Sequence, residues 1–255
     1  MLPPHKRTPT ATPRPPSSPL PNPDPPWLTA LLGTRHPPPP LQSLVATAKA
    51  RLLAADLTTP ALLDPAHAAA FPPDLAAPTT AARTLAADVH VQVADVENLS
   101  RSRWEQVEAL EAIERGEGTR GREIIRLPTN DAADDTLGHD LGDTATTQQP
   151  QQPPTRASAA AAGNATHRLV LQDCRGQNVY AMELTRIERI GVGVTAIGEK
   201  MLIRRGTRVA RGTLLLTPEN CVVLGGKIEA WQRPWVEGRL TRLREAVGSD
   251  AGSGP

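Results

Sequence analysis

The stretch KMLIRRGTRVARGTLLLTPENCVVLGGKI, residues 200–228, decides the fold. It holds three apolar runs of strand length, Met201 to Ile203, Thr213 to Leu216 and Cys221 to Leu224, separated by turn-forming residues. Pro218 has no amide hydrogen for a ladder, so Thr217 to Asn220 predicts a tight reversal with two strands paired across it. Continuous runs such as LLL and VVL indicate strands covered on both faces, as in a small closed barrel plugged by a helix.

Further strands are predicted before this stretch. REIIRL at 122–127 and HRLVL at 167–171 have strand patterns, and Asp173 with Gly176 predicts a hairpin turn into Asn178 to Leu184. Val89, Val91 and Val93 alternate with polar residues, as an extended segment does. Five or six short antiparallel strands with glycine-rich turns match a five-stranded barrel of the OB type. The predicted class is mainly β with a helical head (α+β).

Helical patterns flank these strands. Apolar spacing predicts a helical head about the size of a three-helix unit: one helix from Trp27 to Leu32 stopped by Gly33, a second over 41–56, and a short one after Pro60. Ser102 and Glu105 form a capping box that starts another helix. After the barrel, helical spacing continues to Val247, and Pro234 is expected to kink or divide that helix. Trp231 and Trp235 are expected to pack there rather than stack on nucleic acid.

The composition divides the chain into four parts. We expect a disordered proline-rich tail over 1–26, the helical head over 27–80, the OB-fold domain over 81–247 with a disordered insertion at 129–166, and a disordered tail over 248–255. The insertion, Thr129 to Thr166, holds five aspartates against one arginine and shows no pattern able to form a core.

Charge, cysteines and hydropathy exclude several classes of protein. A formal net charge of +1 argues against bulk electrostatic binding of nucleic acid. The two cysteines form neither a disulfide framework nor a zinc motif. No apolar stretch approaches the ~20 residues of a membrane span, and the N-terminus lacks the apolar core of a secretory signal. These features predict an intracellular protein.

No enzymatic motif is complete. GVTAIGEK at 193–200 approaches a phosphate-binding loop, but Glu199 intrudes before the lysine, and Met201 stands where serine or threonine would bind magnesium. Glu108, Glu111 and Glu114 indicate a solvated helix face rather than a catalytic pair. We therefore expect no enzyme activity, no cofactor and no metal.

Three segments carry a resemblance to a known family. LLLTPENCVVLGGKIEA at 214–230, RVARG at 208–212 and LVLQDCRGQNVYAMEL at 169–184 resemble the N-terminal region of the RecQ-mediated genome instability protein 1 family. SRSRWEQVEALEAIERGEGTRGREIIR at 100–126 and the helical head are similar to short fungal members. The resemblance covers roughly residues 27–247 and implies that the second OB-fold of longer members is missing.

The resemblance implies a nuclear, non-catalytic partner of topoisomerase III and of a RecQ-family helicase. Such a protein acts in recombinational DNA repair, in the dissolution of double Holliday junctions without crossover. In the family, the OB-fold docks on the topoisomerase, and an insertion between the first two barrel strands favours decatenation. Thr129 to Thr166 occupies the matching place here, between REIIRL and HRLVL. No single residue of that insertion can be aligned.

The turns of the deciding stretch supply the candidate partner-binding residues. They are Arg208, Arg211, Pro218, Glu219, Asn220 and Lys227. Their side chains are spare for a partner once the strands are paired, although Pro218 and Asn220 equally suit plain turn chemistry.

The alternative function is autonomous binding of single-stranded DNA, a common use of an OB-fold. Stacking contributes about 1–3 kcal/mol per base, and the predicted barrel strands carry only Tyr180 as an aromatic platform. From His167 to Val247 there are 14 Lys and Arg against 8 Asp and Glu, an excess of 6. This excess predicts weak, salt-sensitive contact with DNA. Because the strands carry so few aromatic side chains, docking to a protein is favoured over autonomous DNA binding.

Overall fold

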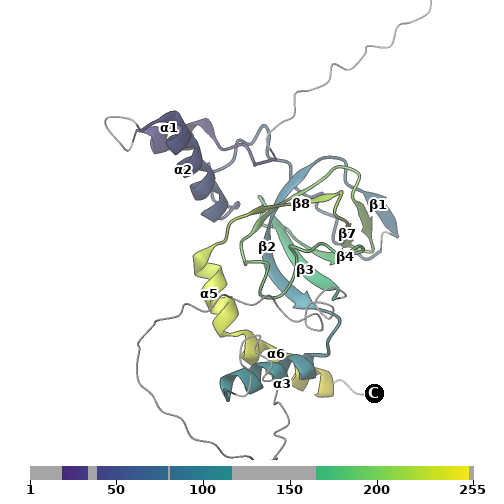
Figure 1. The fold of residues 1–255 in the computed structure, drawn as a ribbon. Coiled ribbons are helices and arrows are strands. Elements are labelled where there is room, and N and C mark those ends of the chain that lie inside the picture. The colour runs from purple at the N-terminus through teal and green to yellow at the C-terminus, as the bar shows by residue number, and fades with distance from the viewer. Residues whose placement is uncertain (1–18, 34–38, 80, 117–164, 253–255) are drawn as a thin grey trace, which may run out of the picture. The chain divides into compact units, whose positions relative to one another are not determined.

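The computed structural model describes residues 19–33, 39–79, 81–116 and 165–252 (Figure 1). The chain forms two compact units. The first comprises residues 1–98 and 166–236, and the second comprises residues 99–165 and 237–255. Each unit is described by itself below. No helix among the described residues is long and apolar enough to cross a membrane.

The first unit contains the sheet and the helical head. Its strands are β1 (Ala82–Thr84), β2 (Val89–Asn98), β3 (His167–Asp173), β4 (Asn178–Glu183), β5 (Lys200–Ile203), β6 (Arg208–Ala210), β7 (Thr213–Leu216) and β8 (Cys221–Gly225). They are hydrogen-bonded in the order β1-β6-β7-β4-β3-β2-β5-β8. The helices are α1 (Pro25–Leu32), α2 (Leu41–Ala54), and α5 (Glu229–Glu237), which ends at the border with the second unit.

The eight strands make a five-stranded barrel because three pairs of them continue one another. Ala82 pairs with Ala210 and Val89 pairs with Ile203, so β1–β2 keeps one register along β6 and β5. Likewise, β5 pairs with β8 and β6 pairs with β7, which makes 200–225 one long antiparallel hairpin. The first arm of this hairpin pairs with β2, and its second arm pairs in parallel with β4. The hairpin therefore joins the two edges of the β2-β3-β4 sheet, which confirms the predicted OB-type barrel.

The tight reversal of this hairpin is not where the sequence predicted it. The chain turns at Arg211 and Gly212, whose φ angles of 47° and 78° are both positive, as in a type I′ hairpin turn. Thr217 to Asn220 is instead a bend within the second arm, because β7 and β8 run in the same direction and pair with different strands. The register slips by one residue between Ile203–Cys221 and Val209–Leu214, as a bulge requires.

The first barrel strand also differs from the prediction. Both edges of β3 are occupied, one by β2 and the other by β4, so β2 rather than REIIRL is the strand that precedes β3 in the barrel. REIIRL at 122–127 lies outside the described residues, as does the predicted insertion except for its last two residues. The segment inserted between the first two barrel strands thus runs from Leu99 to Thr166 and includes a helix.

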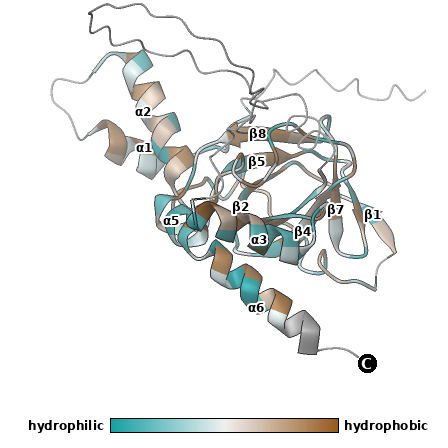
Figure 2. Ribbon diagram, turned by 60° about the horizontal axis from the view of Figure 1, so that its bottom comes forward, coloured by the Kyte–Doolittle hydropathy of each residue, from teal (hydrophilic) through white to brown (hydrophobic). Residues whose placement is uncertain are grey.

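An aliphatic core fills the barrel, and Figure 2 shows the apolar colouring on β5, β7 and β8. The sequence assigned no particular segment to the expected helical plug, and residues 184–199 between β4 and β5 form turns and bends. Three isoleucines of that segment, Ile187, Ile190 and Ile197, are buried in the core. Trp231 and Trp235 of α5 pack against the same core, in agreement with their predicted role.

The head packs on the barrel through the segment after α2. The short helix expected after Pro60 is wrong, because residues 60–70 form turns. Residues before Trp27 also belong to the head: Asp24 N donates to Leu62 O (2.9 Å) and Asp64 N donates to Asn22 O (3.0 Å). The head therefore begins earlier than the predicted tail boundary.

The second unit contains α3 (Arg103–Glu114) and α6 (Arg239–Gly252). Ser102 and Glu105 make the predicted capping box at the start of α3. Arg244 of α6 donates to Glu111 Oε1 at 3.0 and 2.7 Å. Pro234 lies inside α5, and the predicted single helix is divided at Gly238 into α5 and α6. The second helix continues to Gly252, past the predicted start of the C-terminal tail.

Candidate functional site

Five of the six predicted partner-binding residues lie on the long hairpin. Arg208 on β6 and Arg211 in the hairpin turn are exposed, and so are Pro218 and Glu219 in the bend of the second arm. Asn220 is half-buried. The hairpin brings these residues onto one structural element, but the turn at Arg211 and the bend at Thr217 to Asn220 lie at different positions along its length.

Turn chemistry accounts for Asn220. Its Oδ1 accepts a hydrogen bond from Thr217 N (2.8 Å), and its Nδ2 donates to Leu215 O (3.0 Å). Glu219 is fully exposed, and hydrogen bonds from the Thr217 side chain and its own amide lower the pKa of its carboxyl. Pro218 and Glu219 therefore remain available as surface, whereas the Asn220 side chain holds the bend.

Lys227 does not lie with the others. It follows β8, at the end of the hairpin farthest from Arg211, and its Nζ forms an ion pair with Glu229 Oε2 at 2.7 Å. The adjacent Gly226 packs against Leu53 at the end of α2. Lys227 is therefore exposed next to the contact that Gly226 makes with the head, and its charge is paired with Glu229.

The outer face of the sheet carries a surface that sequence reasoning did not identify. Val170 pairs with Tyr180, Tyr180 with Thr213, and Met182 with Leu215, so these side chains occupy neighbouring outward positions on β3, β4 and β7. Tyr180 is 52% exposed, and Leu184 just beyond β4 is 62% exposed. The Arg168 guanidinium lies 5.1 Å from the Tyr180 ring centroid and pairs with Glu97. We call Val170, Tyr180, Met182, Leu184 and Leu215 the outer-face patch.

The burial alternation along β3 and β4 defines this patch in the structure, but the sequence of β3, HRLVLQD, does not alternate between apolar and polar residues and gave no such signal. Every second residue from His167 to Asp173 is buried, and the residues between them are half-buried. The outward set on β4 follows the same period. The patch can be assembled only when the parallel pairing of β4 with β7 is known, and that pairing is long-range.

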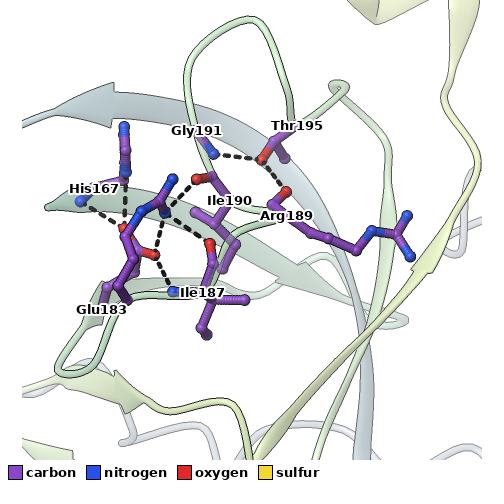
Figure 3. A network of polar contacts seen from close by, with 8 residues as sticks. His167, Glu183, Ile187, Arg189, Ile190, Gly191 and Thr195 are labelled. Atoms are coloured by element: carbon purple, nitrogen blue, oxygen red, sulfur yellow. Dashed lines mark hydrogen bonds and ion pairs between the residues drawn. The ribbon is translucent and has the colours of Figure 1, made fainter. Parts of the chain in front are cut away.

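A buried polar network fixes the point where the inserted segment re-enters the barrel (Figure 3). The Glu183 carboxylate accepts from His167 N (2.9 Å) and Ile187 N (2.9 Å), and its Oε2 lies 2.8 Å from His167 Nδ1. Arg186 Nη1 donates to Glu183 Oε1 (2.7 Å) and to the carbonyls of Ile187 and Ile190. Burial raises the pKa of Glu183, but hydrogen bonds from His167, Ile187 and Arg186 outweigh it, so the pKa lies below its ordinary value.

The network continues into the turns between β4 and β5. Thr195 Oγ1 accepts from Gly191 N (3.0 Å) and donates to Arg189 O (3.2 Å). At the other end of the inserted segment, Asn98 pairs directly with His167 in the β2–β3 ladder. Both ends of residues 99–166 are therefore held at adjacent positions on a rigid sheet.

The phosphate-loop alternative fails on geometry. Residues 193–200 precede strand β5 and are not followed by a helix, which a phosphate-binding loop requires. Lys200 is completely buried, and its Nζ donates to Gly198 O at 2.6 Å. Burial lowers the pKa of Lys200 to about 8, although nearby Asp56 acts in the opposite direction. Among the described residues there is also no group of His, Cys, Asp and Glu that could hold a metal ion.

Comparison with known families matches both parts of the first unit. Residues 71–239 match the family description "RMI1, N-terminal OB-fold domain", and residues 16–60 match "RMI1, N-terminal helical domain". The chain belongs to the RMI1 family. Two RMI1 relatives are RecQ-mediated genome instability protein 1 of Schizosaccharomyces pombe, 29% identical over 150 residues, and that of Xenopus laevis, 42% identical over 107 residues.

The matches cover only part of each protein. The fission yeast alignment spans 59% of this RMI1 family chain and 60% of the relative, and the frog alignment spans 39% of this chain and 17% of the relative. The predicted resemblance to the N-terminal region of the RMI1 family is confirmed.

Proposed function

We propose that this protein is a non-catalytic nuclear subunit that joins a RecQ-family helicase to topoisomerase III. In this role it stimulates decatenation and the dissolution of double Holliday junctions during recombinational DNA repair. The match of both head and barrel to RMI1 domains carries the proposal. The name of both relatives connects those proteins with RecQ-mediated genome instability.

The outer-face patch, with the neighbouring Pro218 and Glu219, is the proposed docking surface for the topoisomerase. Val170, Met182 and Leu215 are half-buried and surround the exposed Tyr180. An exposed aromatic ring within an apolar surround is the arrangement of an interface hot spot. Burying the side chains of Tyr180 and Leu184 would contribute about 1.5–3 kcal/mol each.

The inserted segment is the proposed effector of decatenation. The Glu183 network and the Asn98–His167 pair hold its two ends, so the barrel can dock while the segment reaches the partner. Shortening a loop changes its closure entropy by only about 0.6 kcal/mol per halving of length. Removing residues 130–165 should therefore leave the barrel folded.

Size-exclusion chromatography of the mixed proteins at micromolar concentration tests the partnership. The wild-type protein should co-elute with the cognate topoisomerase III, and Tyr180→Ala with Leu184→Ala should weaken the complex by about 150-fold or more, as expected for a loss of about 3 kcal/mol or more from two buried side chains. Leu41→Ala with Val45→Ala, an exposed apolar pair on α2, is the matched control. Separate elution of the folded wild-type proteins would refute the proposal.

A decatenation assay tests the inserted segment. The protein lacking residues 130–165 should bind the topoisomerase like the wild type and stimulate decatenation less. Equal stimulation by the two proteins would show that the segment is a tolerated insertion without a role in the reaction.

The alternative, an autonomous single-stranded-DNA-binding protein, has one observation in its favour. The exposed Tyr180 ring with Arg168 beside it is a stacking platform for one base. One platform contributes about 1–3 kcal/mol, which corresponds to weak binding. The effect of Tyr180→Ala on DNA affinity tests this alternative.

A further inference from the structure

Four arginines gather on the first arm of the long hairpin and at its turn. Arg204 and Arg205 lie between β5 and β6, Arg208 lies on β6, Arg211 lies in the hairpin turn, and all four side chains are exposed. None of them forms an ion pair with another residue in the described ranges. We call these four residues the arginine stripe.

Five other basic side chains on and around the barrel are paired with carboxylates. The pairs are Arg83–Asp74, Arg168–Glu97, Arg186–Glu183, Arg189–Glu199 and Lys227–Glu229. The stripe is therefore a local concentration of uncompensated positive charge in a protein whose formal net charge is only +1.

The acidic residues nearest to the stripe in the sheet register are bonded to other groups. Asp88 Oδ1 accepts from the backbone N of Arg205 at 2.7 Å, and Glu219 accepts a hydrogen bond from the Thr217 side chain. Neither carboxylate is within ion-pair distance of a stripe guanidinium. The four guanidinium groups consequently keep their hydrogen-bond donors for a ligand.

The backbone that carries the stripe is fixed and open on its outer side. Thr207 Oγ1 donates to Arg204 O (2.6 Å), and Gly206 N donates to Leu85 O (2.8 Å). A Cβ placed on Gly206 would meet no atom within 4 Å. A rigid backbone reduces the ordering cost of binding, and the open space at Gly206 permits close approach of a ligand chain.

The chemistry of the stripe selects a polyanion rather than a protein. The β6–β7 register places Arg208 opposite Leu215, so the stripe borders the outer-face patch, but its own four side chains offer guanidinium groups and no apolar anchor. A fully extended chain from Arg204 to Arg211 would span about 23 Å, but residues 204–207 form a turn, so the stripe covers fewer than about seven phosphate steps along one strand of a duplex.

We propose that the arginine stripe, which borders the outer-face patch at Leu215, is a binding site for the DNA phosphate backbone that is independent of base identity. This assignment goes beyond the proposed partnership with topoisomerase III. It also reassigns Arg208 and Arg211 from protein docking to DNA contact. A docking subunit with such a site holds DNA beside its partner enzyme.

Fluorescence anisotropy with a labelled 20-nucleotide strand and with its duplex, between 50 and 200 mM salt, tests the site. Four phosphate contacts give a salt slope of about −2.8 on the single strand and about −3.6 on the duplex, so the wild type should lose about 50-fold or more in affinity over this range. The variant with Arg204, Arg205, Arg208 and Arg211 all changed to Gln should lose most of its affinity at low salt and most of this slope.

A charge-matched control separates the stripe from net charge. Changing the exposed residues Lys49, Arg51, Arg175 and Arg233 to Gln removes the same four charges elsewhere and should leave most of the affinity and the slope in place. Tyr180→Ala should have little effect on the affinity for DNA or on its salt dependence. Equal losses in the stripe and control variants would overturn the site, as would a loss caused mainly by Tyr180→Ala. A stripe variant that binds DNA like the wild type but no longer co-elutes with topoisomerase III would show a protein-docking surface instead.

Discussion

Substituting Gly226 tests whether the close approach of the head to the barrel stabilises the first unit. Gly226 and Gly206 share the same φ of 86°, so alanine at either position incurs the same left-handed backbone penalty of about 1–2 kcal/mol. Their surroundings differ. A Cβ on Gly206 meets no atom within 4 Å, whereas a Cβ on Gly226 lies 2.7 Å from Leu53 Cβ and 2.9 Å from Leu53 C, and closer still to Leu53 O.

The contact at Gly226 is with backbone and a buried side chain, so it cannot be relieved by a flexible side-chain end. Leu52 and Leu53 at the end of α2 are 3% and 8% exposed. If α2 moves away by about 1 Å and one of these leucines is partly released, the cost is about 1.5–3 kcal/mol. Gly226→Ala should therefore destabilise the protein by about 3–5 kcal/mol, against about 1–2 kcal/mol for Gly206→Ala.

Urea denaturation of both variants measures the two losses, and native-state hydrogen exchange locates them. In Gly226→Ala the Leu57 amide, which donates to Gln92 Oε1 at 2.9 Å across the head–barrel contact, should lose protection. Gly206→Ala should leave that amide protected. Equal destabilisation by the two variants, with Leu57 protected in both, would refute the role assigned to the contact.

Three further predictions concern single side chains. Because burial lowers the pKa of Lys200 to about 8, the unfolded chain holds the Lys200 proton and the folded protein does not between about pH 8 and the ordinary pKa of 10.5, so the Lys200 contribution to stability should rise with pH by up to about 3 kcal/mol. Burial raises the pKa of Cys221 to about 12 and acts in the opposite direction, so the quantity to measure is the difference in unfolding free energy between the wild type and Lys200→Met, in which the Cys221 contribution cancels. That difference should rise across this pH range, and a difference that does not change with pH would contradict the prediction. Glu183→Gln should lower the free energy of unfolding by about 2–4 kcal/mol, because a buried charged acceptor for His167 and Arg186 is lost. The pKa of Glu183 lies below its ordinary value of 4.5, so wild-type stability should decline as pH falls below 4.5, and the variant should lack part of that decline. Melting temperatures that fall in parallel with pH for the two proteins would contradict this prediction. Ser102→Ala should cost about 1 kcal/mol of local stability in α3, seen as faster amide exchange in its first turn, and unchanged exchange would show that Glu105 alone holds the helix start.

The strands that the sequence located correctly are those whose signal is local. The runs at 201–203, 213–216 and 221–224 fall within β5, β7 and β8, and the Asp173–Gly176 turn is held by Asp173 Oδ1 accepting from Arg175 N and Gln177 N. The capping box at Ser102 is equally local. In each case the residues that make the contact lie within a few positions of one another, so their pattern is visible in the sequence.

The misplaced reversal has a physical cause. Arg211 adopts φ of 47°, a conformation that glycine, asparagine or aspartate normally supplies, so the turn lacks the usual composition of a type I′ hairpin. Thr217 to Asn220 has a strong turn composition, but its bonds stabilise a bend within one arm. The composition of Thr217 to Asn220 therefore indicated a change in chain direction, but it did not indicate the angle of that change.

The sequence did not identify β2 as the barrel strand that precedes β3, and this also has a physical cause. The register of β2 against β3 shifts between Val93 and Asp95, and this irregularity interrupts the apolar alternation that identifies a strand. The outer-face patch depended on the same long-range pairings and could not be assembled from sequence. The arginine stripe was visible as a cluster of basic residues, but its lack of carboxylate partners is a property of the folded chain.

Because one hairpin joins both edges of the β2-β3-β4 sheet, the barrel closes only when residues 200–225 have left the ribosome. A nascent chain that ends near residue 190 holds three strands with two unpaired edges, and such edges are templates for aggregation. The β2–β5 pairs join residues more than a hundred positions apart, which makes closure a slow, late step. The incomplete sheet is therefore prone to aggregation during synthesis until the last hairpin has been made and has paired with both edges.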